Sequence, residues 1–202
     1  QLAVAVAQQD LQVWRRFPTT SLAGRTLAVL GLGAVGGRIA AVGAAFGMRV
    51  VGTRRSGRPL PGVSELHPPA ATREAIAAAE VVVVTLPLTP ATRGLLGAEL
   101  LAAMRPGARL IVVGRGGVVD EEALVERLRS GALAGAALDV TASEPPPPGS
   151  PLWGAPNLLL TPHIAGWSPD HVRRVAAVIA ANLDRHDRGL PPLGLVDRDR
   201  GY

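Results

Sequence analysis

Short apolar runs of strand length alternate with segments of helical pattern along most of the chain. The runs are almost continuously apolar, which is typical of strands buried on both faces of a parallel sheet. We expect strands at residues Thr26–Gly31, Arg49–Thr53, Val81–Leu86, Arg109–Val113, Ala134–Val140 and Asn157–Thr161. We expect helices between them at residues Val35–Phe46, Arg73–Ala79, Ala98–Met104 and Glu121–Ser130. This alternation predicts an α/β fold, a doubly wound parallel sheet with helices on both faces.

Capping and breaking residues mark the ends of several elements. We expect Asp120 to cap the helix that follows it and Gly131 to end that helix. Ser168, which precedes a proline, predicts the start of a long last helix that reaches Asp187. The stretch Ser143–Pro151 contains four consecutive prolines, so it predicts an extended surface loop.

The composition argues against several kinds of chemistry. The 202 residues contain no Cys, which removes disulfides and thiolate nucleophiles, and all 21 basic residues are Arg. Without Lys, Schiff-base mechanisms, pyridoxal phosphate attachment and P-loop phosphate binding are disfavoured. The net charge of +5 would suit nucleic acid, but the arginines are scattered and only three Trp, two Phe and one Tyr are available to stack on bases. We therefore expect no nucleic-acid partner and no metal site.

The apolar runs and the start of the chain bear on where the protein is located and on whether residues precede Gln1. No apolar run approaches the roughly 18 to 20 residues that cross a bilayer, so we expect no membrane association and a cytoplasmic location. The chain begins at Gln1, without an initiator Met, inside an amphipathic helical pattern over Leu2–Trp14. We therefore expect further residues upstream.

A glycine motif joins the first predicted strand to the first long helix. It consists of Gly31, Gly33 and Gly36, with Ala34 and Val35 between the last two. Gly31 permits the tight turn, Gly33 carries no side chain to keep a pyrophosphate away, and Gly36 lets the helix pack close to the strand. The alternative is a strand-to-helix turn without a ligand. The position of the glycine motif, between a predicted strand and a predicted helix, favours a Rossmann-type dinucleotide site with the phosphates at the helix N-terminus.

The end of the second predicted strand bears on which dinucleotide is bound. An NAD site usually places Asp or Glu there to accept hydrogen bonds from the ribose hydroxyls, but this chain has Thr53. Arg54, Arg55 and Arg58 follow, and guanidinium groups suit a 2′-phosphate. NADP is therefore the preferred prediction. The alternative is NAD, bound through the backbone and Thr53, with the arginines as ordinary loop charges.

Several longer motifs follow one another in a fixed order. They are the segments Thr85–Gly94, Arg115–Leu124, Ala136–Val140, Glu144–Pro145 and Pro162–Gly166, with an ending at Val196–Tyr202. In this order and spacing the chain resembles the D-isomer-specific 2-hydroxyacid dehydrogenases of the glyoxylate/hydroxypyruvate reductase kind, over essentially its whole length. It departs from that family at Val112, where Asn is usual, and at Gly114, where Ala is usual.

The resemblance implies roles for individual residues. Arg115 would hold the substrate carboxylate and polarise the carbonyl, His163 would supply or take the proton, and Glu144 would hydrogen-bond His163. These groups suit the chemistry, because arriving hydride places negative charge on the carbonyl oxygen. Asp139 would lie near the nicotinamide carboxamide. The other implied cofactor contacts are Leu86, Pro87, Thr92, Gly114, His163 and Gly166.

Each of the three catalytic candidates has an ordinary structural alternative. Arg115 would be a surface charge, Glu144 part of a plain loop, and His163 a structural histidine. Together, however, they stand at or just beyond the ends of predicted parallel strands, the edge of the sheet where open α/β folds place ligands.

The resemblance also implies a domain organisation. Residues 1–18 would form an interdomain helix, residues 19–167 the dinucleotide-binding domain, and residues 168–202 a C-terminal helix and tail that return to a substrate domain. The family's N-terminal substrate domain would precede Gln1, and we expect this chain to be a fragment without it. We therefore expect this chain alone to bind dinucleotide but to turn over poorly, and the sequence does not identify the substrate.

Two functions of different classes are open to such a chain. The first is an oxidoreductase that transfers a hydride between NADPH or NADH and a small 2-oxo acid or D-2-hydroxy acid. The second is a dinucleotide-sensing regulatory module without turnover. Crossover helices with apolar faces often pair across a two-fold axis, so we expect a homodimer.

Overall fold

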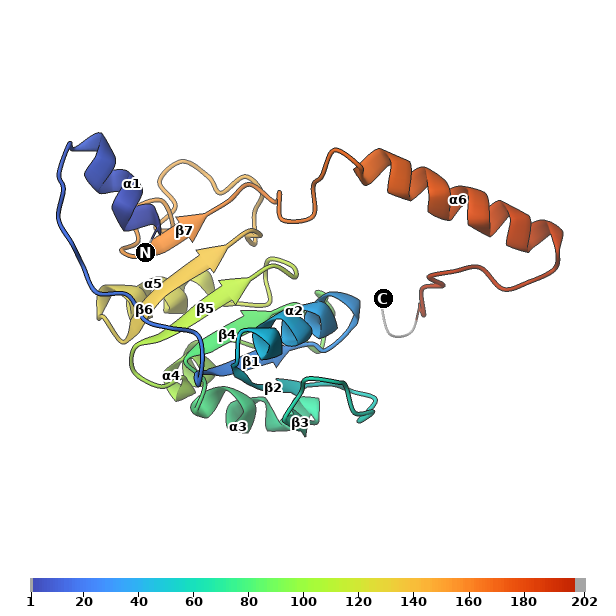
Figure 1. The fold of residues 1–202 in the computed structure, drawn as a ribbon, viewed down its shortest axis with the longest axis horizontal. Coiled ribbons are helices and arrows are strands. Elements are labelled where there is room, and N and C mark those ends of the chain that lie inside the picture. Colours follow the sequence, from blue (N-terminus) through green and yellow to red (C-terminus); the bar gives the residue numbers. More distant parts are fainter. Residues whose placement is uncertain (1, 199–202) are drawn as a thin grey trace.

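A seven-stranded parallel sheet forms the centre of the molecule (Figure 1). This computed structural model describes residues 2–198, and its strand order is β3-β2-β1-β4-β5-β6-β7. The strands are β1 (Thr26–Leu30), β2 (Arg49–Thr53), β3 (Glu65–His67), β4 (Val81–Val84), β5 (Ala108–Val112), β6 (Leu133–Leu138) and β7 (Leu158–Leu160). The order reverses between β1 and β4, which is where sheets of this kind bind ligands. The predicted Rossmann-type α/β fold is confirmed.

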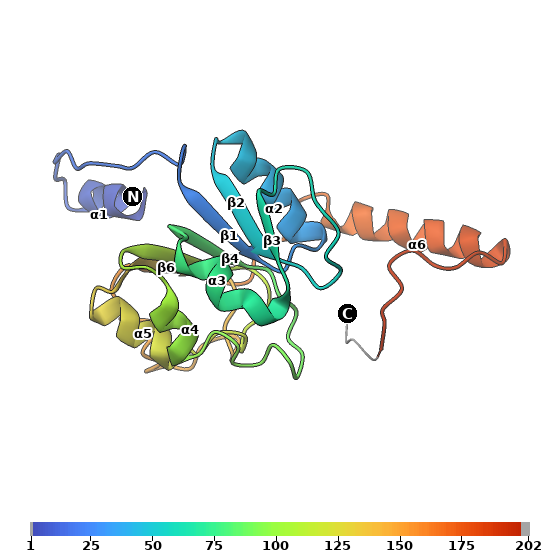
Figure 2. The same ribbon diagram turned by 90° about the horizontal axis from the view of Figure 1, so that it is seen from below.

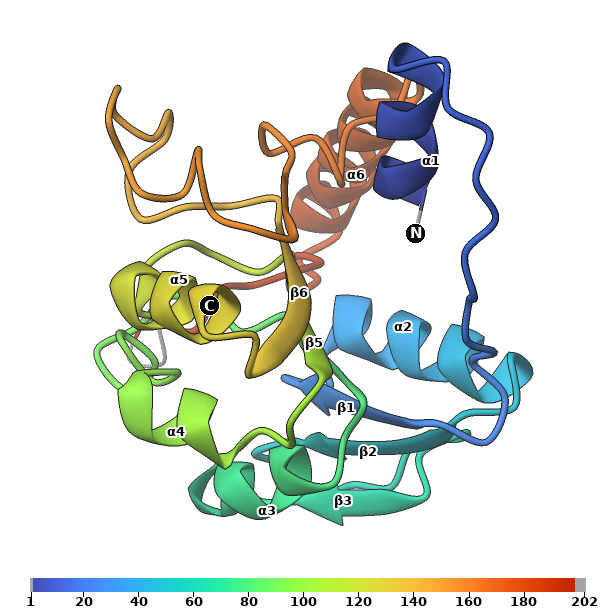
Figure 3. The ribbon, with the colours of Figure 1, turned by 90° about the vertical axis from the view of Figure 1, so that its left-hand side faces the viewer.

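Helices cover both faces of the sheet. The helices of the described residues are α1 (Leu2–Asp10), α2 (Ala34–Ala45), α3 (Thr72–Ala77), α4 (Ala98–Ala103), α5 (Glu121–Arg129) and α6 (His171–Asp187), with a 3-10 turn η1 (Pro69–Ala71) before α3; α2 to α5 cover the sheet. Viewed along the sheet, α2 lies on one face and α3, α4 and α5 lie on the other (Figure 3). The sheet therefore extends to both sides of β1, and the connecting helices lie on both of its faces, as the alternating pattern predicts.

The core is divided by the sheet into two clusters of buried side chains. The larger one joins β4, β5 and β6 to α3, α4 and α5, and Leu110, Leu101 and Leu124 at its centre are fully buried. The smaller one joins α2 to β1 and β2 through Ala40 and Val29. Since burying one such aliphatic side chain contributes about 1.5 to 3 kcal/mol, the larger cluster supplies most of the packing energy.

The expected helix ends are confirmed on α5 and differ on α6. The Asp120 side chain accepts a hydrogen bond from the Ala123 amide at 3.1 Å, and Gly131 has a left-handed φ of 71° just after the helix. The last helix begins at His171 rather than at Ser168, because a single turn precedes it, in which the Ser168 carbonyl accepts the His171 amide at 2.9 Å. The expected loop over residues 143–151 is confirmed.

Two further elements differ from the sequence prediction. Strand β3 was not predicted, since it has only three residues and Glu65 and His67 at its ends are polar. It forms by pairing with β2 at the edge of the sheet. The first helix ends at Asp10 instead of continuing to Trp14.

Helices α1 and α6 stand apart from the packed domain (Figures 1 and 2). Neither contains a buried residue, and apolar side chains such as Val172, Ile179 and Leu183 on α6 are more than half exposed. Within residues 2–198, no helix is long and apolar enough to cross a membrane.

Glu80 joins the starts of three strands at the amino edge of the sheet. Its Oε2 accepts the Thr26 amide at 2.7 Å, and its Oε1 accepts Arg105 Nη1 at 2.5 Å, with Arg25 Nη1 at 3.6 Å. The hydrogen bond from Thr26 is the main cause that lowers the pKa of the Glu80 carboxyl; partial burial opposes it, and Arg105 and Arg25 add to it. The folded state therefore favours the ionised carboxylate.

We predict that Glu80→Gln lowers the melting temperature at neutral pH and that the difference from the wild type shrinks in acid. A carboxyl whose pKa is lowered by folding stabilises the fold above its unfolded pKa, near 4.5, and loses that contribution as pH falls through the folded value. Thermal unfolding of both proteins from neutral pH to below pH 4.5 measures the effect. Glu99→Gln is the control, because Glu99 is 88% exposed in its pair with Arg73 and such surface pairs contribute little. A melting-temperature difference independent of pH would contradict this account.

Candidate active site

The glycine turn between β1 and α2 has the geometry that a dinucleotide phosphate site needs. Gly31 has a φ of 98°, a left-handed conformation that favours glycine. A Cβ on Gly36 would lie 2.3 Å from the Gly31 carbonyl oxygen, so the helix can approach the strand only with glycine there. A Cβ on Gly33 would meet no atom of residues 2–198 within 4 Å. The turn is therefore closely packed between Gly31 and Gly36 and open at Gly33.

The start of α2 presents backbone donors to this open side. Gly33 is the N-cap and provides no side-chain hydrogen bond to the helix. The amides of the first turn, which include Ala34, Val35 and Gly36, have no intrahelical acceptor in an α-helix. An anionic pyrophosphate at this place would receive hydrogen bonds from these amides and the favourable end of the helix dipole. The residues present therefore fit a dinucleotide.

The end of β2 places Thr53 and Arg54 in different surroundings, because successive side chains of a strand alternate. Thr53 is only 3% exposed, and its Oγ1 accepts the Gly31 amide at 3.2 Å. Its hydroxyl thus lies beneath the glycine turn and not in the open, which argues against the expected direct contact with a ribose. Arg54 is half-buried, and its Nη1 donates to the Arg58 carbonyl at 3.0 Å.

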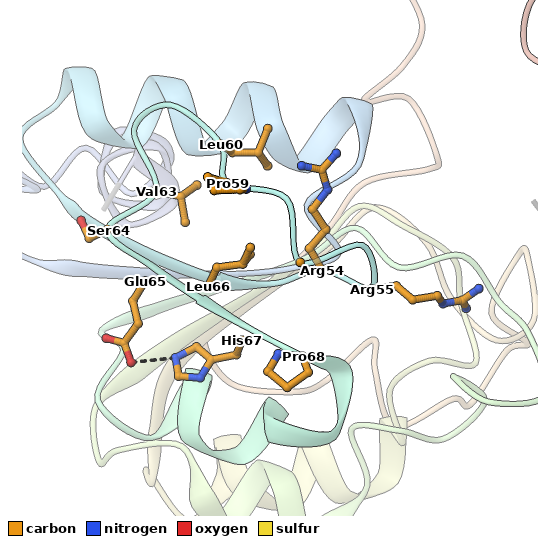
Figure 4. A pocket seen from close by; sticks show the side chains of 11 residues that line it. Arg54, Arg55, Pro59, Leu60, Val63, Ser64, Glu65, Leu66, His67 and Pro68 are labelled. Atoms are coloured by element: carbon orange, nitrogen blue, oxygen red, sulfur yellow. Dashed lines mark ion pairs between the residues drawn. The ribbon is translucent and has the colours of Figure 1, made fainter.

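A pocket of about 370 Å³ lies between β3 and the connection that follows β2 (Figure 4). Arg54 and Arg55 line one end of it, and Pro59, Leu60 and Val63 supply apolar surface. The Glu65–His67 ion pair, 3.0 Å long, lies at the strand β3. The Arg54 and Arg55 side chains extend from this end of the pocket in different directions (Figure 4), and guanidinium groups at such a place suit the phosphate of an adenosine bound beside them.

The proton-transfer candidates meet at the carboxyl edge of the sheet. His163 Nδ1 and Glu144 Oε2 are 2.7 Å apart, although Glu144 follows β6 and His163 follows β7. The side chains are 47% and 39% exposed, so both are accessible from solvent. A carboxylate on Nδ1 leaves Nε2 as the ring nitrogen available for proton transfer. The predicted Glu144–His163 hydrogen bond is thus present in the structure.

Glu144 is held in its ionised form by its neighbours. The hydrogen bond with His163 is the largest cause that lowers the pKa of the Glu144 carboxyl, and partial burial opposes it. The Thr141 amide, which donates to Glu144 Oε1 at 3.2 Å, and the positive charge of Arg115 lower that pKa further. Arg115 itself is exposed, with its Nη1 donating to the Gly114 carbonyl at 2.7 Å. The three predicted catalytic residues are therefore electrostatic neighbours.

Asp139 organises the turn that carries His163. Its two carboxylate oxygens accept Thr161 Oγ1 at 2.5 Å, the Ile164 amide at 3.0 Å and the Ala165 amide at 2.9 Å, and its carbonyl accepts the His163 amide at 2.9 Å. Burial opposes ionisation of Asp139, but these hydrogen bonds and the nearby His163 outweigh it and lower the pKa of the carboxyl. The sequence did not single out Thr161, although it stands directly before Pro162-His163 in the motif.

His163 itself adopts a left-handed backbone conformation with a φ of 53°. Such a conformation is disfavoured for residues other than glycine by roughly 1 to 2 kcal/mol. The hydrogen bonds to Asp139 on both sides of His163 stabilise it. The structure thus fixes the direction of the histidine side chain through its backbone.

Close backbone contacts fix the loop that carries Arg115. A Cβ on Gly114 would lie 2.5 Å from the Leu86 carbonyl oxygen, and one on Gly116 would lie 1.8 Å from the Thr141 carbonyl oxygen. The loops after β4, β5 and β6 therefore touch through their main chains. Gly114, where the family usually has Ala, fits this arrangement because no side chain has room.

The remaining predicted cofactor residues lie in loops at the carboxyl edge of the sheet. Leu86 and Pro87 are half-buried just after β4, and Gly166 is exposed beyond His163. Thr92 is also half-buried, and its hydroxyl donates to the Pro87 carbonyl at 2.6 Å and accepts the Thr89 amide at 2.8 Å. Its hydroxyl holds the loop together. Within residues 2–198, no cluster of three or more His, Asp or Glu side chains is placed to hold a metal ion.

The sequence matches a family model and several curated proteins. Residues 1–165 match the family model described as D-isomer specific 2-hydroxyacid dehydrogenase, NAD binding domain. A glyoxylate reductase from Aeropyrum pernix is 40% identical over 179 residues, which are 88% of this chain and 53% of that protein. The chain spans 53% to 59% of the length of three curated relatives that it matches.

The fold of this chain also resembles that of solved protein structures. A D-isomer specific 2-hydroxyacid dehydrogenase from Xanthobacter autotrophicus, in complex with NADPH and MES, is 43% identical with a TM-score of 0.90, over 100% of this chain and 82% of that one. An NADPH-dependent glyoxylate/hydroxypyruvate reductase from Sinorhizobium meliloti, in complex with NADP and sulfate, is 35% identical with a TM-score of 0.89, over 98% and 64%. With its glycine turn, its parallel sheet and its Glu144–His163 pair, the chain belongs to the D-isomer specific 2-hydroxyacid dehydrogenase family, whose NAD binding domain it contains.

Proposed function

We propose that this chain is the dinucleotide-binding part of an oxidoreductase that transfers a hydride between NAD(P)H and a small 2-oxo acid or its D-2-hydroxy acid. The observation that carries the proposal is the 2.7 Å contact between His163 and Glu144 at the sheet edge that also carries Arg115 and the glycine turn. The names of two relatives, a glyoxylate reductase and a glyoxylate/hydroxypyruvate reductase, support this substrate class.

The proposed chemistry divides between the cofactor and the side chains of this chain. The nicotinamide ring, when bound, supplies the hydride. Arg115 binds the substrate carboxylate and faces the carbonyl oxygen, where negative charge develops. His163 donates the proton to that oxygen in reduction and removes it in oxidation. Glu144 orients the imidazole through its hydrogen bond with Nδ1.

For the cofactor, the proposal is a preference for NADP over NAD. Arg54 and Arg55 line the pocket after β2, and the buried Thr53 accepts the Gly31 amide on its Oγ1. Acidic residues that would accept ribose hydrogen bonds are lacking from the segment 48–61. NAD is the alternative outcome of the binding test below.

The domain organisation and assembly are part of the same proposal. Residues 19–167 bind the dinucleotide, and residues 1–18 and 168–202 connect this domain to a substrate domain or to a second copy in a homodimer. The exposed apolar faces of α1 and α6 support contacts of this kind. A cytoplasmic location remains our prediction, as does the poor turnover of the 202 residues alone.

We predict that His163→Gln in the complete polypeptide lowers kcat for reduction of glyoxylate or hydroxypyruvate by about 10²- to 10⁴-fold, the usual effect of losing a general acid. Glu144→Gln should lower kcat by a smaller factor, because the amide oxygen can still accept a hydrogen bond from Nδ1 but places no negative charge beside the ring. Initial rates of NADPH oxidation as a function of pH measure both effects.

His186→Gln serves as the matched control, since His186 lies in the last turn of α6 and not beside Arg115 or Glu144. It should keep the wild-type rate. Tight NADPH binding by the wild type without oxidation across a panel of 2-oxo acids would favour the regulatory module and reject the enzyme.

We predict that the chain binds NADPH at least tenfold more tightly than NADH and that Arg54→Ala removes most of this difference. A charge-assisted hydrogen bond contributes about 1.5 to 3 kcal/mol, or tenfold and more in affinity. Fluorescence titration with each cofactor measures the ratio. Arg173→Ala, which removes the same charge from α6, should leave the ratio unchanged. A tenfold preference for NADH in the wild type would overturn the assignment of Arg54 and Arg55.

A further inference from the structure

Two threonines hold Gly31 from opposite sides. Thr53, at the end of β2, accepts the Gly31 amide on its Oγ1 at 3.2 Å. Thr85, just after β4, donates its hydroxyl to the Gly31 carbonyl at 2.6 Å and lies 3.1 Å from the Leu30 carbonyl. Because β2 and β4 are the two neighbours of β1 in the sheet, the strand order itself brings both hydroxyls to Gly31.

The backbone of the turn is tied down further by main-chain bonds. The Leu32 amide donates to the Thr53 carbonyl at 2.9 Å, and the Gly33 amide donates to the Gly31 carbonyl at 2.7 Å. The polar groups on the inner side of the turn are thereby satisfied. The amides at the start of α2 are left to face the open side, where Gly33 carries no side chain.

Thr85 also occupies the space that Gly36 leaves. A Cβ on Gly36 would lie 2.9 Å from Thr85 Oγ1 as well as 2.3 Å from the Gly31 carbonyl. The third glycine of the motif therefore makes room for a hydroxyl in addition to close helix packing.

Glycine-rich turns have a physical weakness that such contacts correct. Glycine populates many backbone conformations, so a turn with three glycines loses much conformational freedom when a ligand fixes it. Hydrogen bonds that fix the turn beforehand reduce this loss and strengthen binding without touching the ligand.

The geometry points to Thr53 and Thr85 as a pair of positioning residues that preorganise the phosphate-binding turn. Thr53, expected from the sequence to contact the ribose, acts through Gly31 instead. This inference rests on the proposed dinucleotide binding and assigns no contact between either threonine and the cofactor.

The test compares NADPH binding by Thr53→Val and Thr85→Val with that by the wild-type chain. Valine keeps the shape of threonine and removes the hydroxyl. Each variant should weaken NADPH binding by about 3- to 10-fold, the value of one hydrogen bond. Thr53→Ser and Thr85→Ser, which restore the hydroxyl, should recover most of the affinity. Fluorescence titration gives the Kd, and thermal unfolding verifies that each variant is folded.

Thr72→Val provides the control for a general loss of stability. Thr72 is also buried, at 4% exposure, and its hydroxyl donates to the Pro69 carbonyl at 2.7 Å, in η1 and α3 and not in the turn. It should lower the melting temperature as the other two do and keep the wild-type Kd. Equal weakening by Thr72→Val, or wild-type affinity in both Thr53→Val and Thr85→Val, would overturn the inference.

A measurement without ligand separates this inference from the proposed function. Hydrogen exchange at the Gly31 amide should be faster in Thr53→Val and Thr85→Val than in the wild type or in Thr72→Val. If the wild type bound no dinucleotide, the proposed function would fail. The exchange measurement needs no ligand, so it would still decide whether the two threonines hold the turn. Unchanged exchange at Gly31 would reject the pair of positioning residues.

Discussion

Close contact between main chains at the carboxyl edge of the sheet is the constraint on which the site depends. Parallel strands deliver their following loops to one edge, and here these loops touch backbone to backbone. Gly36 against Gly31, Gly114 against Leu86 and Gly116 against Thr141 leave no room for a Cβ. Because main-chain atoms are less free to move than side chains, the Gly36 contact fixes the shape of the phosphate turn, and the other two fix the Arg115 loop against the loops after β4 and β6.

A second level of organisation uses buried polar groups under the exposed functional ones. Asp139 holds the turn around His163, and Glu144 then orients its imidazole ring. Thr92 holds the loop after β4 in a similar way through its own backbone neighbours. The exposed His163 is thus supported by polar residues with hydrogen bonds of their own, which is what a preorganised site requires.

The sequence predicts most of this fold because its strands are long and apolar. Six of the seven strands and the helices that cover the sheet follow from hydrophobic pattern, but β3 does not, since its formation depends on the edge that β2 offers. Motif order likewise locates Arg115, Glu144 and His163. It does not show which way a hydroxyl points, so the sequence does not reveal the backbone contacts of Thr53 and Thr92 or the roles of Thr85 and Thr161. Those directions depend on strand alternation and loop closure, which only the three-dimensional structure displays.

The strand order also separates two tasks within one sheet. The phosphate turn and the arginines that face the proposed 2′-phosphate belong to β1, β2 and the connection to β3, whereas Arg115, Asp139, Glu144 and His163 follow β5, β6 and β7. The boundary between the two groups lies between β1 and β4, where the strand order reverses. Substitutions at the proposed 2′-phosphate site can therefore accumulate on one half of the molecule without displacing the residues around His163 on the other, and cofactor choice becomes a trait that evolution or engineering can alter separately from the proposed reaction.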